Sequence, residues 1–217
     1  MPRPAGREIR VARRAYAGGV PDRVVIVRHG RTAYNDLHRL NGDPSVDVRL
    51  TAAGLAQVAR LRPRVAALPI DLGVRTRFPR TAVTLDILLA GRRPPRVVCP
   101  DLDDIRLGEF EGADVEAYRE FRCVHGQDAR PEGGESRLDA LARYVRGLRR
   151  ILALDARTPL VVTHDIPIRF VLNALEQADP LDGPVTAIEN GVLYDLSASD
   201  LTRAVDRMEE RLPSAAA

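Results

Sequence analysis

Short apolar runs alternate along this chain with longer stretches in which apolar residues recur every three or four positions. The run at 23–27 (RVVIV) is continuous, which is typical of a strand buried on both faces of a sheet. Similar runs predict further strands at 70–74, 96–99, 159–162 and 192–196. Each run is short and ends near a glycine, a proline or a polar residue, as expected of a strand in a compact sheet.

The stretches between these runs have the period of amphipathic helices. Thr51 can cap a helix at its N-terminus, and Pro63 should bend or end that helix. Residues 78–90 predict a helix that stops at Gly91. The longest periodic stretch is 136–154, and further helices are predicted at 114–122 and 166–175. Strands that alternate with helices predict an α/β fold, a three-layer α/β/α sandwich with a mostly parallel central sheet.

The length of 217 residues predicts one domain, which we place at 23–212. Residues 1–22 contain several arginines and no apolar segment, so they predict a loosely ordered basic arm and not a secretory signal. Residues 213–217 predict a frayed tail. We find no apolar run long enough to cross a membrane.

The amino-acid composition indicates which ligands and partners the protein can bind. All 33 basic residues are arginine, so any basic side chain that binds an anion offers a guanidinium fork, which suits phosphate oxygens. The net charge of +3 is small and does not favour a nucleic-acid partner. Cys99 and Cys123 lack the spacing of a metal site, which favours a reduced, cytoplasmic protein without a metal or cofactor.

Two of the four histidines follow predicted strands directly. His29 comes after RVVIVR and His164 after PLVVT. Ligands of open α/β sheets bind outside the carboxyl ends of the strands, so these two side chains could meet there. His38 and His125 lie in polar, irregular segments and are expected at the surface.

The segment RHGRTAYN at 28–35 has the residues that a phosphate site needs. Arg28 can contact phosphate oxygens, and Gly30 lets the backbone approach a ligand closely. Thr32 and Asn35 add short polar groups. A neutral imidazole at His29 is a competent nucleophile, although a strand end that carries a histidine by chance would show the same spacing.

RHGRTAYN resembles the R-H-G-x-T-x-x-N signature of the histidine phosphatase superfamily, the phosphoglycerate-mutase-like enzymes. Six further segments are similar to motifs of this family and follow in the same order: 47–57 (DVRLTAAGLAQ), 76–84 (TRFPRTAVT), 102–112 (LDDIRLGEFEG), 131–136 (PEGGES), 161–169 (VVTHDIPIR) and 189–196 (ENGVLYDL). The matches cover residues 23–197. The resemblance therefore implies a phosphoglycerate-mutase-like fold.

The resemblance also implies roles for individual residues. His29 would accept the phosphoryl group, and Arg28, Arg80 and a protonated His164 would bind its oxygens. Asn35 would add a polar contact. Two guanidinium groups and an imidazolium would offset the charge of a phosphate monoester, which is close to a dianion at neutral pH.

Two positions depart from the family pattern. The family's general acid is a glutamate, and Asp104 stands in its place with a side chain about 1.5 Å shorter. The backbone could compensate, or Glu109 or Asp103 could contribute. Asp165 stands where the family has glycine. We expect it to cap the following helix, but it could also repel the substrate phosphate or bind His164 or a substrate hydroxyl.

These residues predict a metal-independent phosphomonoesterase that hydrolyses a small phosphorylated metabolite through a phosphohistidine. The alternatives are a mutase of the phosphoglycerate-mutase type and a weakened relative that binds phosphorylated ligands without turnover. A homodimer is possible, and we expect neither nucleic acid nor membrane as a partner. The pocket rim should come from 36–46 and 106–134, where arginines could select a second anionic group. The candidate rim residues are Arg39, Arg106, Tyr118, Arg119 and Arg122.

Overall fold

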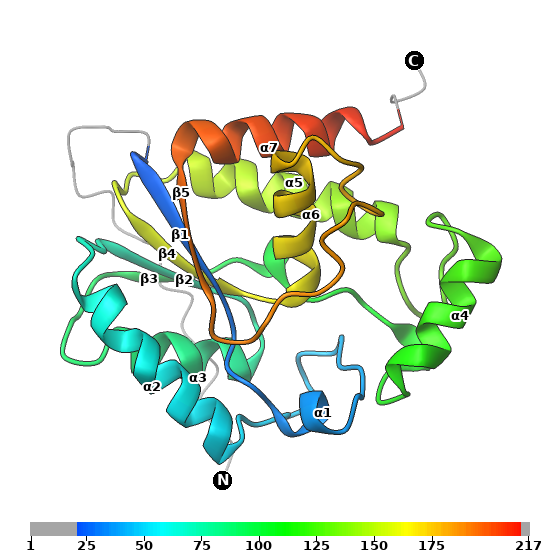
Figure 1. Ribbon diagram of the computed structural model, residues 1–217, viewed down its shortest axis with the longest axis horizontal. Helices are drawn as coiled ribbons and strands as arrows, with labels where there is room; N and C mark the ends of the chain where they lie inside the picture. Colours follow the sequence, from blue (N-terminus) through cyan, green and yellow to red (C-terminus); the bar gives the residue numbers. More distant parts are fainter. Residues whose placement is uncertain (1–20, 214–217) are drawn as a thin grey trace, which may run out of the picture.

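A computed structural model describes residues 21–213, in which five strands form one sheet in the order β3-β2-β4-β1-β5 (Figure 1). The strands are β1 (Arg23–Arg28), β2 (Leu72–Arg75), β3 (Arg96–Val98), β4 (Pro159–Thr163) and β5 (Leu193–Ser197). The first four are parallel and β5 runs antiparallel to β1, which confirms the predicted mostly parallel sheet. Most of the predicted basic arm, residues 1–20, and residues 214–217 of the predicted tail lie outside the described residues.

Helices cover both faces of this sheet, which confirms the α/β/α sandwich (Figure 1). The helices are α1 (Ala33–Asp36), α2 (Ala52–Ala66), α3 (Pro79–Leu88), α4 (Val115–His125), α5 (Arg137–Leu152), α6 (Asp165–Leu175) and α7 (Ala198–Glu210), with 3-10 turns at Pro100–Leu102 and Gly108–Phe110. Helices α2 and α3 pack on one face, and α5, α6 and α7 pack on the other. Helix α4 lies apart from the sheet, at the right of the view in Figure 1.

The strand β1 shows why its sequence is continuously apolar. Val25 and Val27 point into the core beneath α2 and α3, whereas Val24 and Ile26 point into the core beneath α5, α6 and α7. All four side chains are almost fully buried. Alternate side chains of a strand point to opposite faces, so a strand covered on both faces has no position left for a polar residue.

The predicted start of α2 is confirmed, but its predicted end is not. The Thr51 hydroxyl accepts a hydrogen bond from the Gly54 N–H at 3.1 Å and caps α2. The helix does not end at Pro63 but continues to Ala66. Proline lacks the donor for one helical hydrogen bond and its ring crowds the preceding turn, but the buried Val65 anchors the last turn against the core.

Helix α7 was not among the predicted elements. Its buried side chains are Leu201, Ala204, Val205 and Met208, which have the spacing of an amphipathic helix. The hydroxyl of Ser197 caps it by accepting from the Asp200 N–H at 3.0 Å. The pattern was therefore present in the sequence, although among many charged residues.

Three further observations concern residues 21–213. None of the helices there is both long and apolar enough to cross a membrane. The same part of the chain has no group of three acidic, histidine or cysteine side chains placed to hold a metal ion. Cys99 is buried, Cys123 is exposed, and both are free thiols.

Candidate active site

The sheet brings the two strand-end histidines together. Strands β1 and β4 are parallel neighbours, and Arg28 lies opposite Thr163 in their register. The next residues, His29 and His164, therefore leave the sheet at the same level, with ring centroids 5.4 Å apart. Both side chains are almost completely buried. The predicted meeting of these histidines at the carboxyl edge of the sheet is a feature of the structure.

Hydrogen bonds fix the orientation of the His29 ring. Its Nδ1 lies 2.8 Å from the Gly30 carbonyl oxygen, so Nδ1 carries the proton and donates it. The opposite nitrogen, Nε2, accepts a hydrogen bond from Arg80 Nε at 3.1 Å. Burial, followed by the charges of Arg80 and Arg28, holds the pKa of His29 well below its usual value. The ring is thus a neutral imidazole with an unprotonated Nε2.

Arg80 connects the groups of the site. Besides Nε2 of His29, its guanidinium reaches His164 Nδ1 at 3.1 Å and Asp104 Oδ2 at 3.1 Å. It lies over the ring of Phe78, 4.1 Å from the centroid. Burial lowers the pKa of Arg80 to about 10, so the guanidinium stays charged at neutral pH. A buried positive charge therefore lies between the two imidazoles.

His164 is held by partners on both ring nitrogens. Nδ1 faces Arg80, which can only donate, so the proton of the neutral ring lies on Nε2 and points to the Thr76 hydroxyl at 3.0 Å. Burial and then the charges of Arg80 and His29 lower its pKa well below the usual value. A second cation beside a buried guanidinium is unfavourable, which favours the neutral ring, and the protonation of His164 by a bound phosphate dianion stays a prediction.

Asp104 lies within the same group of side chains despite its short side chain. Its Oδ2 is 3.1 Å from Arg80 Nη2 and 3.5 Å from His164 Nδ1. Its Oδ1 accepts from the Ile105 N–H at 3.1 Å. Burial raises the pKa of Asp104, which favours the protonated form that a general acid requires.

The backbone around Asp104 is fixed by Arg143 of α5. The Arg143 guanidinium donates to the carbonyl oxygens of Asp101, Asp103 and Asp104 at 3.1, 2.9 and 3.1 Å. It also forms an ion pair with the buried Glu135, which lies in the PEGGES segment. This clamp sets where the short aspartate side chain begins.

The two alternative acids are directed elsewhere. Asp103 is buried, and its carboxylate accepts hydrogen bonds from both the backbone and the side chain of Arg77. Glu109 is exposed and accepts from the Glu132 N–H at 3.0 Å. Neither residue lines the pocket that contains His29. Of the three candidate acids, only Asp104 reaches the histidines.

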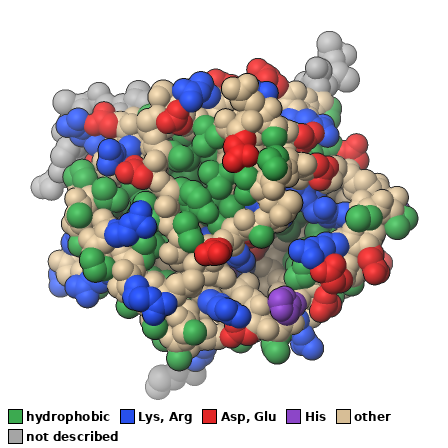
Figure 2. Space-filling model, in the orientation of Figure 1, with side chains coloured by type: hydrophobic (Ala, Val, Ile, Leu, Met, Phe, Trp, Pro, Cys, Tyr) green, Lys and Arg blue, Asp and Glu red, His purple; other side chains and the backbone are tan. Residues whose placement is uncertain are grey.

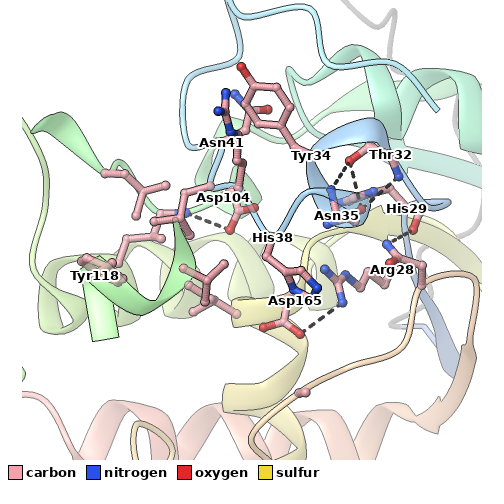
Figure 3. A pocket seen from close by; sticks show the side chains of 18 of the residues that line it. Arg28, His29, Thr32, Tyr34, Asn35, His38, Asn41, Asp104, Tyr118 and Asp165 are labelled. Atoms are coloured by element: carbon pink, nitrogen blue, oxygen red, sulfur yellow. Dashed lines mark hydrogen bonds and ion pairs between the residues drawn. The ribbon is translucent and has the colours of Figure 1, made fainter. Parts of the chain in front are cut away.

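The two remaining predicted phosphate ligands also line this pocket. Arg28 Nη1 donates to the Ile188 carbonyl, and its buried Nε has no hydrogen-bond partner within residues 21–213. The Asn35 Oδ1 accepts from the Thr32 N–H at 3.0 Å in the capping box of α1 (Figure 3). The amide oxygen of Asn35 thus stabilises the loop after β1, and its contact with phosphate stays a prediction.

Asp165 does not cap α6, so that expectation is wrong. His164 occupies the N-cap position, and Asp165 is the first helical residue. Its carboxylate accepts from the Ile188 N–H at 2.8 Å and lies 3.5 Å from Arg28 Nη1 and 3.1 Å from Arg169 Nε. These partners draw Asp165 sideways, and Figure 3 shows its carboxylate linked to Arg28 beside the cavity.

These groups lie at the base of a cavity of about 460 Å³. One wall comes from the segment after β1, with Tyr34 of α1 and His38, and the opposite wall includes Tyr118 of α4 (Figure 3). Figure 2 shows the hollow in the molecular surface with arginine side chains along its border. His38 and His125 are exposed as predicted, although His38 also lines the pocket.

The predicted rim is confirmed at four of five side chains. The four that line the cavity are Arg39, Tyr118, Arg119 and Arg122. Arg106 does not line it, because its side chain turns to the buried Glu135, 3.2 Å away. A third wall was missed entirely. It consists of residues of α6 and the loop before β5, namely Ile166, Arg169, Thr186 and Ala187.

Sequence reasoning also missed residues that support the site. The Asn41 side chain and carbonyl both accept from Arg80, and Glu111 in turn accepts from Asn41 Nδ2 at 2.8 Å. Asn190 donates to the His29 carbonyl at 2.9 Å. Asn41 and Asn190 lie in loops where no period or spacing marks them. Glu111 and Asn190 lie within segments that resemble the family, which is the available signal for them.

The arrangement suits a phosphoryl group. An unprotonated imidazole nitrogen, two guanidinium groups, a second imidazole and one carboxyl group face a single cavity. A family model described as "Histidine phosphatase superfamily (branch 1)" matches residues 24–211. The chain belongs to the histidine phosphatase superfamily.

Known members of this superfamily include several relatives of the chain. The probable phosphoglycerate mutase GpmB of Proteus mirabilis is 29% identical over 160 residues, which cover 70% of this chain and 74% of that protein. The adenosylcobalamin/alpha-ribazole phosphatase of Salmonella typhimurium is 28% identical over 65% of this chain and 73% of that protein. The crystal structure of TTHB049 from Thermus thermophilus is 32% identical, covers 80% of this chain and 92% of that chain, and superimposes with a TM-score of 0.61. Relatives in this superfamily thus carry the names of both phosphatases and mutases.

Proposed function

We propose that this protein is a phosphatase that hydrolyses a small phosphorylated metabolite through a phosphohistidine on His29. The observation that carries the proposal is the unprotonated Nε2 of a fixed, neutral His29 beside the Arg80 guanidinium. The lone pair of Nε2 is the nucleophile, and the guanidinium lies where negative charge of a bound phosphoryl group would be stabilised.

The reaction has two steps. In the first, Nε2 of His29 forms a bond to phosphorus, the bond to the ester oxygen breaks, and the departing alkoxide takes the proton of Asp104. In the second, water attacks the phosphohistidine, the Asp104 carboxylate takes a proton from that water, and the bond between nitrogen and phosphorus breaks to release inorganic phosphate. Arg28 and Arg80 bind the oxygens of the phosphoryl group throughout, and Asn35 adds a polar contact. His164 joins them once the phosphate dianion favours a proton on its Nδ1.

A mutase is the second candidate, since a relative carries that name. A mutase would return the phosphoryl group to a second hydroxyl and must therefore keep water out. The short segment between Glu111 and Glu135 favours a phosphatase, because it supplies only α4 to cover the cavity. A weakened binding protein is less favoured, because Asp104 reaches the histidines despite its length.

The proposal includes the setting of the enzyme. A small phosphate ester is the partner, and the small net charge gives no reason to add nucleic acid or a membrane. The free thiols of Cys99 and Cys123 agree with a reducing cytoplasm. Whether two copies associate as a homodimer stays a prediction.

The test is phosphate release from an aryl phosphate without added metal, beside a His29→Ala control. An aryl leaving group needs little protonation, so the assay isolates the nucleophile and the phosphate ligands from Asp104. We expect release that depends on His29. Release that is equal in the wild type and in His29→Ala would refute the proposed phosphatase.

A further inference from the structure

The walls of the active-site cavity carry a large excess of positive charge. Seven arginines and two aspartates are among the described residues that line it: Arg28, Arg31, Arg39, Arg80, Arg119, Arg122, Arg169, Asp104 and Asp165. Burial lowers the pKa of both histidines of the site and so disfavours their charged forms. The dianion of a phosphate monoester needs only the arginines at the base, so the excess lies along the walls.

Most of the wall arginines are neutralised by acids. Arg31 is paired with Asp36, Arg119 with Glu116 three residues earlier on α4, and Arg169 with Asp165. Such partners reduce what an arginine can offer to a ligand.

Arg122 and Arg39 differ from these. Within residues 21–213 neither forms an ion pair with an acidic side chain, and both line the cavity. The Nε of Arg122 is buried and lacks a hydrogen-bond partner in the same part of the chain. A buried guanidinium nitrogen without a partner is unfavourable, so this position is better explained if a ligand supplies the partner.

The two unpaired arginines belong to connected walls. The backbone of Arg39, which follows α1, forms an isolated antiparallel β-bridge with the backbone of Asp114. Asp114 directly precedes α4, the helix that carries Arg122. Tyr118 lies one turn before Arg122 on α4 and is itself buried. The wall that carries Arg122 is therefore anchored to the loop that carries Arg39 and is placed to face a ligand bound at His29.

We propose that the substrate carries a second anionic group, a carboxylate or a further phosphate, which Arg122 binds with help from Arg39. This inference rests on the proposed phosphatase and names its substrate class. The phosphate ester lies at the base against Arg28 and Arg80, and the second anion lies at the wall formed by α4. The paired Arg119 and the outward-facing Arg106 take no part.

The experiment compares phenyl phosphate, carboxyphenyl phosphate and phenylene bisphosphate as substrates for the wild type, Arg122→Gln and Arg39→Gln. The quantity measured is the ratio of kcat/KM for each doubly anionic substrate to that for phenyl phosphate, which cancels any general loss of activity. We expect a ratio of about ten or more in the wild type, because a tenfold change corresponds to about 1.4 kcal/mol, the size of one hydrogen bond to a charged group. Arg122→Gln should bring the ratio close to one, and Arg39→Gln should lower it in part.

Arg203→Gln is the matched control, since it removes the same charge from an exposed pair on α7, far along the chain from the cavity. Its ratio should equal that of the wild type. A wild-type ratio near one, or a ratio that Arg122→Gln leaves unchanged, overturns the inference while the phosphatase stands. If phenyl phosphate is not hydrolysed at all, the proposed function fails. Calorimetry then tests the second anion site by itself, by comparing the binding of phenylphosphonate and carboxyphenylphosphonate. Equal affinities for these two compounds would overturn the inference.

Discussion

Replacing Arg143 with glutamine should damage both stability and the placement of the acid. The Arg143 side chain is 12% exposed and its partner Glu135 only 2%, so the pair is largely removed from water. Removal of one partner from a buried ion pair costs about 3–5 kcal/mol. Glu135 retains Arg106, whose guanidinium lies 3.2 Å away and whose N–H donates at 3.0 Å, so we expect the lower end, about 3 kcal/mol.

The same change releases the carbonyl oxygens of Asp101, Asp103 and Asp104. A shift of Asp104 by about 1 Å should lower the rate on an alkyl phosphate by ~10²-fold. An aryl phosphate, whose leaving group needs little protonation, should lose much less. A purely structural defect would lower both rates by the same factor.

Urea unfolding followed by circular dichroism measures the first effect, and parallel assays on alkyl and aryl phosphates measure the second. The control is Arg150→Gln on the same helix. Arg150 is exposed, and its partner Asp101 also lies near Arg146, so this change should alter stability by less than about 1 kcal/mol. The reasoning is wrong if Arg143→Gln and Arg150→Gln destabilise equally, or if Arg143→Gln slows both classes of substrate alike.

Four further predictions concern the acids and the histidine. Asp104→Asn should lower kcat on alkyl phosphates by ~10²-fold or more and leave aryl phosphates within about tenfold, and equal losses on both would exclude Asp104 as the acid. Asp165→Asn removes the negative charge beside Arg28, so inorganic phosphate should inhibit this variant at about tenfold lower concentration. The control is Asp86→Asn on α3, which removes a negative charge from an exposed pair. Weaker or unchanged inhibition of Asp165→Asn would contradict the prediction. Burial raises the pKa of Asp104, so alkyl phosphate turnover should fall as pH rises through that raised value, and Asp104→Asn should lack this fall. Burial lowers the pKa of His29, so activity should persist in acid below the usual imidazole range, and a loss centred on that range would show that the ring is not held neutral.

The sequence predicted the base of the site because two strands are marked clearly by their composition. A run that is apolar at every position must be buried on both faces, and parallel neighbours end at one edge of the sheet. His29 and His164 follow from this reasoning, whereas Arg80 and Asp104 required resemblance to a family. Arginines are common on helices and aspartates are common in acidic loops, so position alone does not distinguish Arg80 or Asp104 from other residues of the same type.

The walls of the cavity could not be predicted to the same extent. The loop before β5 and the start of α6 form a wall through tertiary contacts alone, such as the bond from the Ile188 N–H to Asp165. Local preference suggested a cap for Asp165, but two arginines brought close by the fold offered stronger partners. Arg106 failed as a rim residue for the same reason, since the buried carboxylate of Glu135 attracts it away from the cavity.

The most direct test of the central claim is detection of the phosphorylated intermediate. The protein is mixed with an aryl phosphate, quenched at alkaline pH within the first turnover, and analysed by mass spectrometry of the peptide that contains His29. We predict that this peptide gains the mass of one phosphoryl group, that the modification disappears when substrate is exhausted, and that the peptide containing His164 stays unmodified. Turnover without any phosphorylation of His29, or with phosphorylation at His164 instead, would contradict the account.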